Sequence, residues 1–436
     1  MGPAPASILD LSPEILVQIL EYLCPHCSGE VKGTDTRSLG TRDSRLVEAS
    51  QSNLHGLSTS CRKLRNIAQP CLYHYIVQTE NARLIARTLL QRPSLAQTVE
   101  GLSITALDFN GEDDETLSDE DLATLELQMQ TVSTDALEND TFERENILGM
   151  LMLGHTPNIQ KLSVLTDSFI PMMYYPDGAL SCLTILRANC DDTENGFGLS
   201  ALAGIMRAAP NLKTFVASNL VKVSLEEGEI FSESVTEVNI AEAAIWKEDF
   251  DMLIQGFPSL QVFRFETGGD RANYIWCASP ADMAKSLLAR KETLKKLNLS
   301  VSAEFFPDGK LERGDMIDDL SRMTALESIT LNIDSIYTEF GADFYDSDSD
   351  DDFYEYGPSL IDLLPESVRV LGIVEPSDVE DGIMELAASA PERFPLLRKV
   401  MLQYVNDNMY MAFKKAFKKA GIKCVKSKRL DLIVHA

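Results

Sequence analysis

The chain has 436 residues, and its 67 acidic against 39 basic residues give a formal net charge of −28. Such a charge repels phosphate backbones and anionic bilayers, so we expect neither nucleic acid nor a membrane as a partner. Without a membrane-length apolar run or a secretory signal segment, the sequence predicts an intracellular protein, cytoplasmic or nuclear, with reduced cysteines.

The first predicted element is a helix over residues 11–23. Ser12 is suited to the N-cap, Pro13 to the first helical position, and Glu14 faces the positive end of the helix dipole. Apolar residues then recur at helical spacing, which predicts a wide apolar face: Ile15, Leu16, Ile19, Leu20 and Leu23.

A second helical pattern follows, and we expect Pro70 to end it. Its apolar positions are Leu54, Leu57, Cys61, Leu64, Ile67 and Ala68. Between the two patterns, residues 28–43 are rich in Ser, Thr and Gly and predict a disordered insertion.

These two segments resemble an F-box, the helical module that docks a protein onto a Skp-type adaptor of a ubiquitin ligase. The resemblance lies in an L-x-x-E-I-L-x-x-I-L-x-x-L pattern from Leu11 to Leu23 and a C-R-x-L-R-x-I-A pattern from Cys61 to Ala68. It implies adaptor contacts through Leu11, Pro13, Glu14, Ile15, Leu16, Ile19, Leu20, Leu23, Leu57, Cys61 and Leu64.

Beyond residue 76 a short strand-like phrase recurs, separated by helical stretches such as residues 199–210, 248–258, 280–292 and 382–392. A possible first copy lies at residues 99–104. The apolar anchor of each later phrase is Leu162, Leu186, Phe215, Val238, Phe263, Leu297, Ile329, Leu371 and Val400.

The spacing of these anchors resembles that of degenerate leucine-rich repeats. We therefore predict an α/β fold: a three-helix F-box in residues 1–76, then an irregular solenoid, or horseshoe, in residues 77–436 with parallel strands on its concave face. A doubly wound sheet is the alternative. Acidic insertions are expected near residues 111–121 and 341–356, and a basic helical cap at residues 409–429.

Polar residues beside or after the anchors would face a protein target from the concave surface. The candidates are Arg187, Asn189, Asn239, Arg264, Glu266, Asn298, Asn332 and Gln403, with Ser300 and Thr330 as further members. In the second acidic insertion, Ser347 and Ser349 resemble sites for acidophilic kinases.

The sequence Cys24-Pro-His-Cys27 resembles a redox motif, but it follows a helix C-terminus, where the dipole disfavours a thiolate. Zinc would need further ligands, for which His55 or Cys61 are candidates. The spacing matches no known zinc module, and we predict no catalytic, cofactor or metal site.

The expected function is that of a non-catalytic receptor in an SCF-type ubiquitin ligase, a monomer within a larger complex. It would bind a Skp-type adaptor, through it a cullin, and a protein substrate that the sequence does not identify. A repeat scaffold uncoupled from ubiquitination and an α/β enzyme are the alternatives.

Overall fold

The computed structural model describes residues 7–24, 27–28, 42–77, 82–104, 123, 127, 144–165, 176–190, 195–224, 230–268, 277–306, 311–340, 354–356 and 358–427. The chain divides into two compact units, one of residues 1–191 and 201–216, the other of residues 192–200 and 217–436. Within the described residues, no helix combines the length and the apolarity that crossing a bilayer requires.

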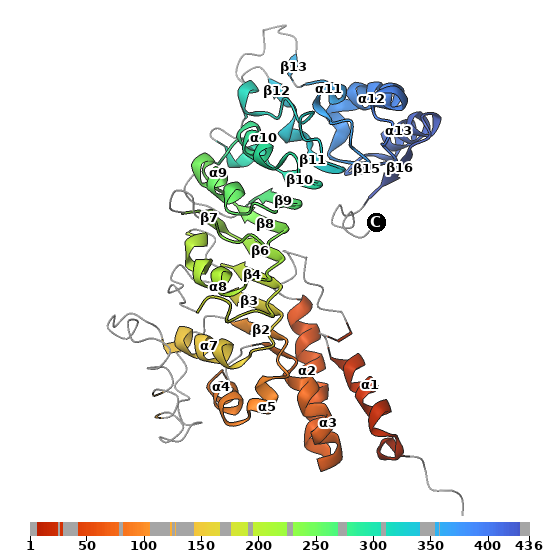
Figure 1. Ribbon diagram of the computed structural model, residues 1–436. Coiled ribbons are helices and arrows are strands. Elements are labelled where there is room, and N and C mark those ends of the chain that lie inside the picture. The colour runs from red at the N-terminus through yellow and green to blue at the C-terminus, as the bar shows by residue number, and fades with distance from the viewer. Residues whose placement is uncertain are drawn as a thin grey trace, which may run out of the picture. The chain divides into compact units, whose positions relative to one another are not determined.

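The N-terminal unit begins with helices and continues with strands (Figure 1). Its helices are η1 Ile8–Asp10, α1 Pro13–Leu23, α2 Arg42–Ser60, α3 Arg62–Tyr73, α4 Ala82–Gln91, α5 Pro93–Ala96, α7 Arg144–His155 and α8 Ala203–Ala208. Its strands are β1 Tyr75–Val77, β2 Gly101–Ile104, β3 Lys161–Leu165, β4 Ile185–Asn189 and β6 Thr214–Ser218, the last of which extends into the second unit.

The first predicted helix is confirmed as α1, with Ser12 at the N-cap and Pro13 at the first position. Ser12 makes no capping bond to the backbone, however. Its side chain hydrogen-bonds the carboxylate of Glu14 instead, and this bond is the main cause of the lowered pKa of Glu14.

The second helical pattern lies on two helices, α2 and α3, separated at Cys61. Cys61 is the N-cap of α3, and its Sγ accepts from the backbone N–H of Leu64 at 3.5 Å. The expectation that Pro70 ends the helix is wrong, because α3 continues to Tyr73. Cys71 and Leu72 pack into the core shared with α1 and α2, and this burial offsets the donor that proline lacks.

The insertion predicted at residues 28–43 lies mostly outside the described residues, and its last two residues belong to α2. The predicted domain boundary at residue 76 falls inside β1, a strand that the sequence analysis missed. β1 pairs with β2 in parallel, and a Cβ on Gly101 would lie 2.1 Å from the Tyr75 ring. Glycine at position 101 therefore permits this pairing.

The C-terminal unit contains a parallel main sheet, whose strands are joined mainly by short helices, together with two-stranded pairings outside it. Its strands are β5 Phe197–Gly198, β7 Leu220–Lys222, β8 Glu237–Ala243, β9 Val262–Thr267, β10 Lys296–Ser300, β11 Ser328–Asn332, β12 Thr338–Phe340, β13 Tyr354–Tyr356, β14 Val370–Val374, β15 Lys399–Gln403 and β16 Lys423–Lys426. The pairings outside the main sheet are β5 with β7 and β12 with β13. Its helices include α9 Lys247–Gln255, α10 Pro280–Leu287, η5 Leu288–Arg290, η9 Ile333–Ser335, α11 Leu360–Leu363, α12 Glu380–Arg393 and α13 Asp407–Lys419.

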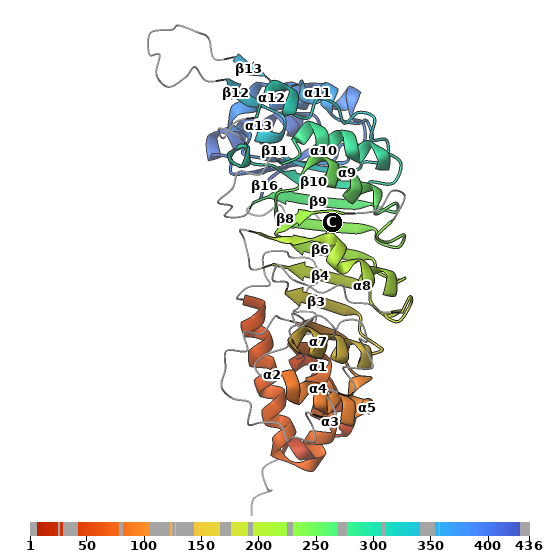
Figure 2. The ribbon, with the colours of Figure 1, turned by 90° about the vertical axis from the view of Figure 1, so that its left-hand side faces the viewer.

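Within each unit the strands of the main sheet pair in chain order. The order is β1-β2-β3-β4-β6 in the N-terminal unit and β8-β9-β10-β11-β14-β15-β16 in the C-terminal unit. A doubly wound sheet reverses its strand order at a switch point, so this alternative is wrong. Figure 2 shows consecutive strands of each unit lying side by side.

The predicted anchors occupy equivalent positions in neighbouring strands. In the N-terminal unit, Leu102 pairs with Leu162 and Leu162 with Leu186. In the C-terminal unit the paired row is Val238, Phe263, Leu297, Ile329, Leu371, Val400 and Cys424. The α/β class and its parallel strands are therefore confirmed, with one buried anchor repeated in each strand.

Helices of the C-terminal unit cover one face of its strands (Figure 1), and α9 packs there through an aromatic ring. Phe250 of α9 meets both Phe263 and Phe265 of β9 edge to face, at centroid distances of 5.7 and 5.6 Å. At the C-terminal end, Phe413 and Phe417 of α13 are fully buried and Gly421 has φ +75°, as the predicted cap requires. β16 adds an unpredicted strand after that helix.

The acidic insertions are described only in part. Residues 111–121, Ser347 and Ser349 lie outside the described residues. Tyr354–Tyr356, predicted as part of an insertion, instead forms β13, which pairs antiparallel with β12.

Non-glycine residues with positive φ recur four positions after an anchor. They are Asn219 (φ 59°), Glu242 (φ 52°), Glu375 (φ 57°) and Tyr404 (φ 55°). This conformation costs about 1 kcal/mol per residue. It turns the chain directly after β6, β14 and β15, and in β8 it lies at an irregularity of the register. In one of these turns the Glu375 N–H donates to the Gln403 carbonyl at 3.0 Å.

Asn332 is the last residue of β11 and holds the chain that follows β10. Its Oδ1 accepts from the Val301 N–H at 3.0 Å, its Nδ2 donates to the Val301 carbonyl at 2.5 Å, and Ser335 donates to the same Oδ1. The residue is only 6% exposed. Its amide is thus used inside the fold, which corrects its predicted role in target binding.

We predict that Asn332→Ala lowers the free energy of unfolding by about 2 kcal/mol, because two buried backbone groups of Val301 lose their partner. Urea denaturation followed by circular dichroism measures this change. Asn298→Ala, at a half-exposed position on β10, is the matched control, and equal losses for both variants would contradict the structural role of Asn332.

Candidate functional site

The helices α1, α2 and α3 pack around a small apolar core. Leu20 and Cys24 of α1 meet Leu54 of α2 and two residues of α3, Ala68 and Cys71. The helical segment thus forms an interior of its own, to which the face of α1 carrying Leu16 and Leu20 contributes.

Three of the predicted adaptor-binding residues are buried, and one of them, Leu20, belongs to this core. Leu16, Leu20 and Leu64 are 1, 2 and 5% exposed. The expectation that these side chains touch a partner needs correction, because their surface is already buried within the chain. Helical periodicity alone could not tell which part of a wide apolar face is covered.

A second row of apolar residues begins at Leu11, just before α1, continues along the helix and is uncovered. Leu11 (37% exposed), Ile15 (43%), Ile19 (36%) and Tyr22 (80%) recur every three or four residues, and we call these four residues the apolar stripe. Residues at this spacing lie on one side of a helix. Pro13 and Glu14 are exposed beside the stripe, and Leu23, Leu57 and Cys61 are half-buried.

The turn η1 before α1 enlarges this surface. Its Ile8 and Leu9 are 46 and 41% exposed, and the sequence analysis did not single them out. Lys63 of α3 donates to the carbonyls of Leu9 (2.6 Å) and Leu11 (3.2 Å), which holds η1 beside α3. These hydrogen bonds thus hold the apolar residues of η1 next to the start of the apolar stripe.

The predicted target-binding residues of the C-terminal unit form rows across the strands. Asn239, Arg264, Asn298 and Thr330 are paired neighbours on β8 to β11, and Glu266 pairs with Ser300. Within the first row, however, Arg264 donates to Asn239 Oδ1 and, at 2.5 Å, to the Glu237 carboxylate.

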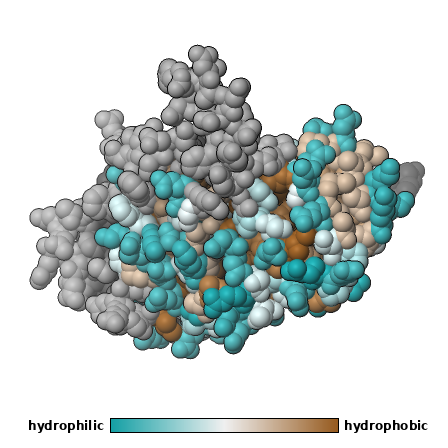
Figure 3. All heavy atoms as spheres, turned by 90° about the horizontal axis from the view of Figure 1, so that it is seen from above, coloured by the Kyte–Doolittle hydropathy of each residue, from teal (hydrophilic) through white to brown (hydrophobic). Residues whose placement is uncertain are grey.

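Asn239 is only 1% exposed, so it supports Arg264 and does not itself offer a contact surface. Glu266, Asn298 and Gln403 are half-buried and lie on the sheet as predicted. In the N-terminal unit, Arg187 is 6% exposed and Asn189 is half-buried. On the face of the molecule drawn in Figure 3, most of the coloured surface is hydrophilic, with smaller apolar areas between.

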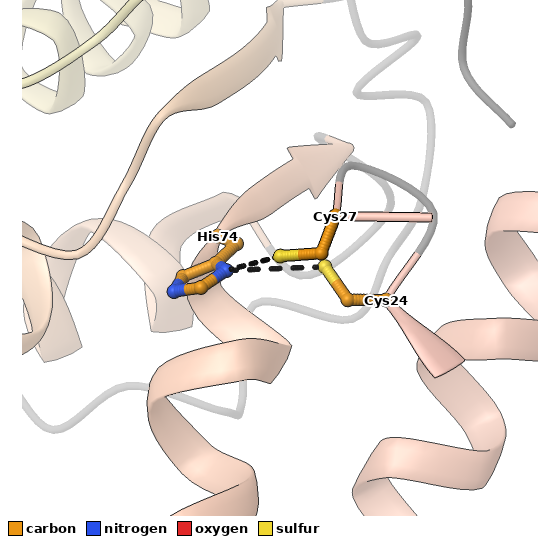
Figure 4. A group of neighbouring side chains, drawn as sticks. All are labelled: Cys24, Cys27 and His74. Carbon is orange, nitrogen blue, oxygen red and sulfur yellow. Dashed lines mark hydrogen bonds between the residues drawn. The ribbon is translucent and has the colours of Figure 1, made fainter. Parts of the chain in front are cut away.

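A second cluster lies where α1 and α3 end. Cys24 is the C-cap of α1, Cys27 follows in a turn, and His74 is the C-cap of α3 (Figure 4). The His74 Nδ1 lies 3.2 Å from the Cys27 Sγ and 3.9 Å from the Cys24 Sγ. The partner of the two cysteines is therefore His74, and not His55 or Cys61 as the sequence suggested.

Burial and neighbouring groups raise the pKa of two thiols here, those of Cys27 and Cys71. Partial burial, followed by the nearby Cys24, raises the pKa of Cys27 to about 12. Burial likewise raises the pKa of Cys71 to about 11, and the hydrogen bond with Cys24 is the main cause of the raised pKa of His74. Because nucleophilic thiols need a lowered pKa, these shifts argue against a redox role for the cysteine pair.

Comparison with known proteins gives no family assignment: neither a scan against family models nor a search of curated proteins matches this chain.

We predict that Cys27 of metal-free protein reacts slowly with iodoacetamide at pH 8, because only the thiolate attacks. Its rate should rise about tenfold per pH unit over the accessible alkaline range, since the pKa of Cys27 is raised to about 12. Mass-spectrometric peptide mapping after chelation measures this rate, with exposed Cys182 as the internal control. A rate for Cys27 that levels off near pH 8 would contradict the prediction.

Proposed function

We propose that this protein is the substrate-recognition subunit of an SCF-type ubiquitin ligase. Its N-terminal helices would act as an F-box that docks a Skp-type adaptor. The observation that carries this proposal is the apolar stripe, which is exposed along α1 while Leu16 and Leu20 of the same helix are buried.

The division of the F-box-like residues between exposed and buried positions supports an adaptor as the occupant of the stripe. Leu11, just before α1, and Ile15 and Ile19 within it are exposed. Leu16 and Leu20 of the same pattern are buried, and Leu20 belongs to the core shared by α1, α2 and α3. One apolar sequence pattern thus supplies both a core face and a partner face, as a docking module requires.

The energy available from the stripe suits a protein partner. Covering the exposed parts of four large apolar side chains contributes roughly 1 kcal/mol for each. Association also costs rotational and translational freedom, so the stripe needs further contacts, for which Ile8 and Leu9 are adjacent.

The strand–helix repeats would hold the protein target. Parallel strands in chain order with one anchor per strand support the leucine-rich-repeat resemblance. Glu266, Asn298 and Gln403 are the partly exposed polar residues that remain candidates for target contact, and Arg264 joins them through its fixed position beside Glu237.

In this proposal the chain contributes proximity and not chemistry. The adaptor links it to a cullin and the attached conjugating enzymes, and target binding raises the effective concentration of the acceptor lysine. The protein would work as a monomer within that complex, in the cytoplasm or the nucleus.

We predict that Ile15→Asp combined with Ile19→Asp abolishes co-purification of the adaptor and cullin, because two charges would enter an apolar interface. Both side chains are exposed, so the variant should fold like the wild type, as circular dichroism would show. Affinity purification with quantitative mass spectrometry measures the loss.

Met411→Asp is the matched control, because Met411 is a 60% exposed apolar residue on α13. It should leave adaptor binding intact. If the folded double variant still captured the adaptor, the docking assignment would fail. Substitution of Leu16 or Leu20 would be uninformative, since it disrupts the core.

We further predict that the double variant prolongs the half-life of proteins that bind the repeats. Cells carrying the wild type or the double variant in place of the endogenous chain can be compared by pulse-labelling and proteomics. Wild-type protein should shorten the half-life of its bound targets severalfold. Equal half-lives in both cells would favour an interaction scaffold that is not coupled to ubiquitination.

A further inference from the structure

We propose that Cys24, Cys27 and His74 bind a zinc ion that fastens the end of α1 to the end of α3. The three residues offer two sulfurs and one imidazole nitrogen, and these atoms lie within 4.8 Å of one another. Thiolate and imidazole are the ligands that zinc prefers in structural sites. The donor atoms support this site whether or not the N-terminal helices dock an adaptor.

The distances between the donor atoms agree with one shared ion. With zinc–sulfur bonds of about 2.3 Å and zinc–nitrogen bonds of about 2.0 Å, tetrahedral ligands lie roughly 3.5–3.8 Å apart. The two sulfur–nitrogen distances of 3.2 and 3.9 Å lie on either side of that value. In Figure 4 the same ring nitrogen faces both sulfurs, so one imidazole can complete the pair.

The backbone prepares this arrangement. The Ser28 N–H donates to the Cys24 carbonyl at 2.9 Å and closes a tight turn that brings Cys27 back beside Cys24. His74 ends α3, and its own N–H donates to the Cys71 carbonyl at 3.3 Å. Each of the three candidate ligands therefore lies at a helix end or in a turn, and none of them depends on a long loop for its position.

The electrostatic setting favours a cation. The negative ends of α1 and α3 both lie at the cluster, because Cys24 and His74 are C-cap residues. Glu21 is near enough to act on the ionisation of Cys27 and His74. The same features oppose a catalytic thiolate, so a metal ion explains the cluster better than redox chemistry does.

The consequence would be a cross-link between segments that are far apart in sequence. Cys24 and His74 are separated by the insertion and by α2. A metal bond between them would close this loop in the folded state and restrict the end of α1. Zinc would then stabilise the helix that carries the apolar stripe.

The test uses full-length protein purified with a reducing agent, loaded with zinc chloride and freed of excess metal. Elemental analysis should find one zinc per chain in the wild type and less than a tenth of that in Cys27→Ser and His74→Asn. X-ray absorption of the wild type should show two sulfur ligands. Chelation should lower the melting temperature of the wild type and leave that of Cys27→Ser unchanged.

Cys182→Ser and His55→Asn are the controls, because Cys182 and His55 are an exposed cysteine and an exposed histidine of the same unit. Both should retain the full zinc content. Cys27 is itself exposed, so its variant should stay folded, as circular dichroism would verify. The site would be refuted if the wild type held no zinc, if the zinc survived both ligand substitutions, or if Cys24 and Cys27 formed a disulfide under these conditions.

Discussion

The structure depends on the parallel pairing of strands that each place one apolar anchor at the same position. In the C-terminal unit the row from Val238 to Val400 is buried, and every member lies opposite the next. Because this row fixes the register, the connections between strands can differ in length without shifting any side chain to the wrong face. Helices such as α9 and α12 then need only an apolar face to cover the anchors.

Polar residues around the anchors fall into two groups, those that make hydrogen bonds inside the fold and those that are half-exposed. The position of a residue on its strand does not by itself show to which group it belongs. The side-chain amide of Asn332 hydrogen-bonds the backbone of Val301, and Arg264 contacts Glu237 and Asn239. Such residues stabilise the repeat because a buried polar group without a partner is costly. Residues such as Glu266 and Gln403 are half-exposed and so keep surface for another molecule. A target-binding surface on this sheet would therefore contain fewer residues than the polar positions that the sequence predicted for it.

At the N-terminal end, α1 has two sets of apolar residues that differ in exposure. The face with Leu16 and Leu20 is buried, and the apolar stripe is left in solvent. Exposure of large apolar residues at helical spacing carries a free-energy cost that a partner would remove. The cluster of Cys24, Cys27 and His74 lies directly at the end of this helix. The proposed docking surface and the proposed metal site therefore share one element, and a change in either can affect the other.

The sequence by itself determined the alternation of strands and helices and the row of anchors, because helical periodicity and a repeated strand phrase are local properties. It also identified α1, from Ser12 and Pro13 through the apolar positions that follow. Only the tertiary structure decided which apolar residues of α1 are covered, since Leu16 and Ile15 are equivalent in a sequence pattern. It also decided that His74 joins Cys24 and Cys27, and that Asn332 is structural. Those outcomes depend on contacts between residues distant in the chain, which no local pattern encodes.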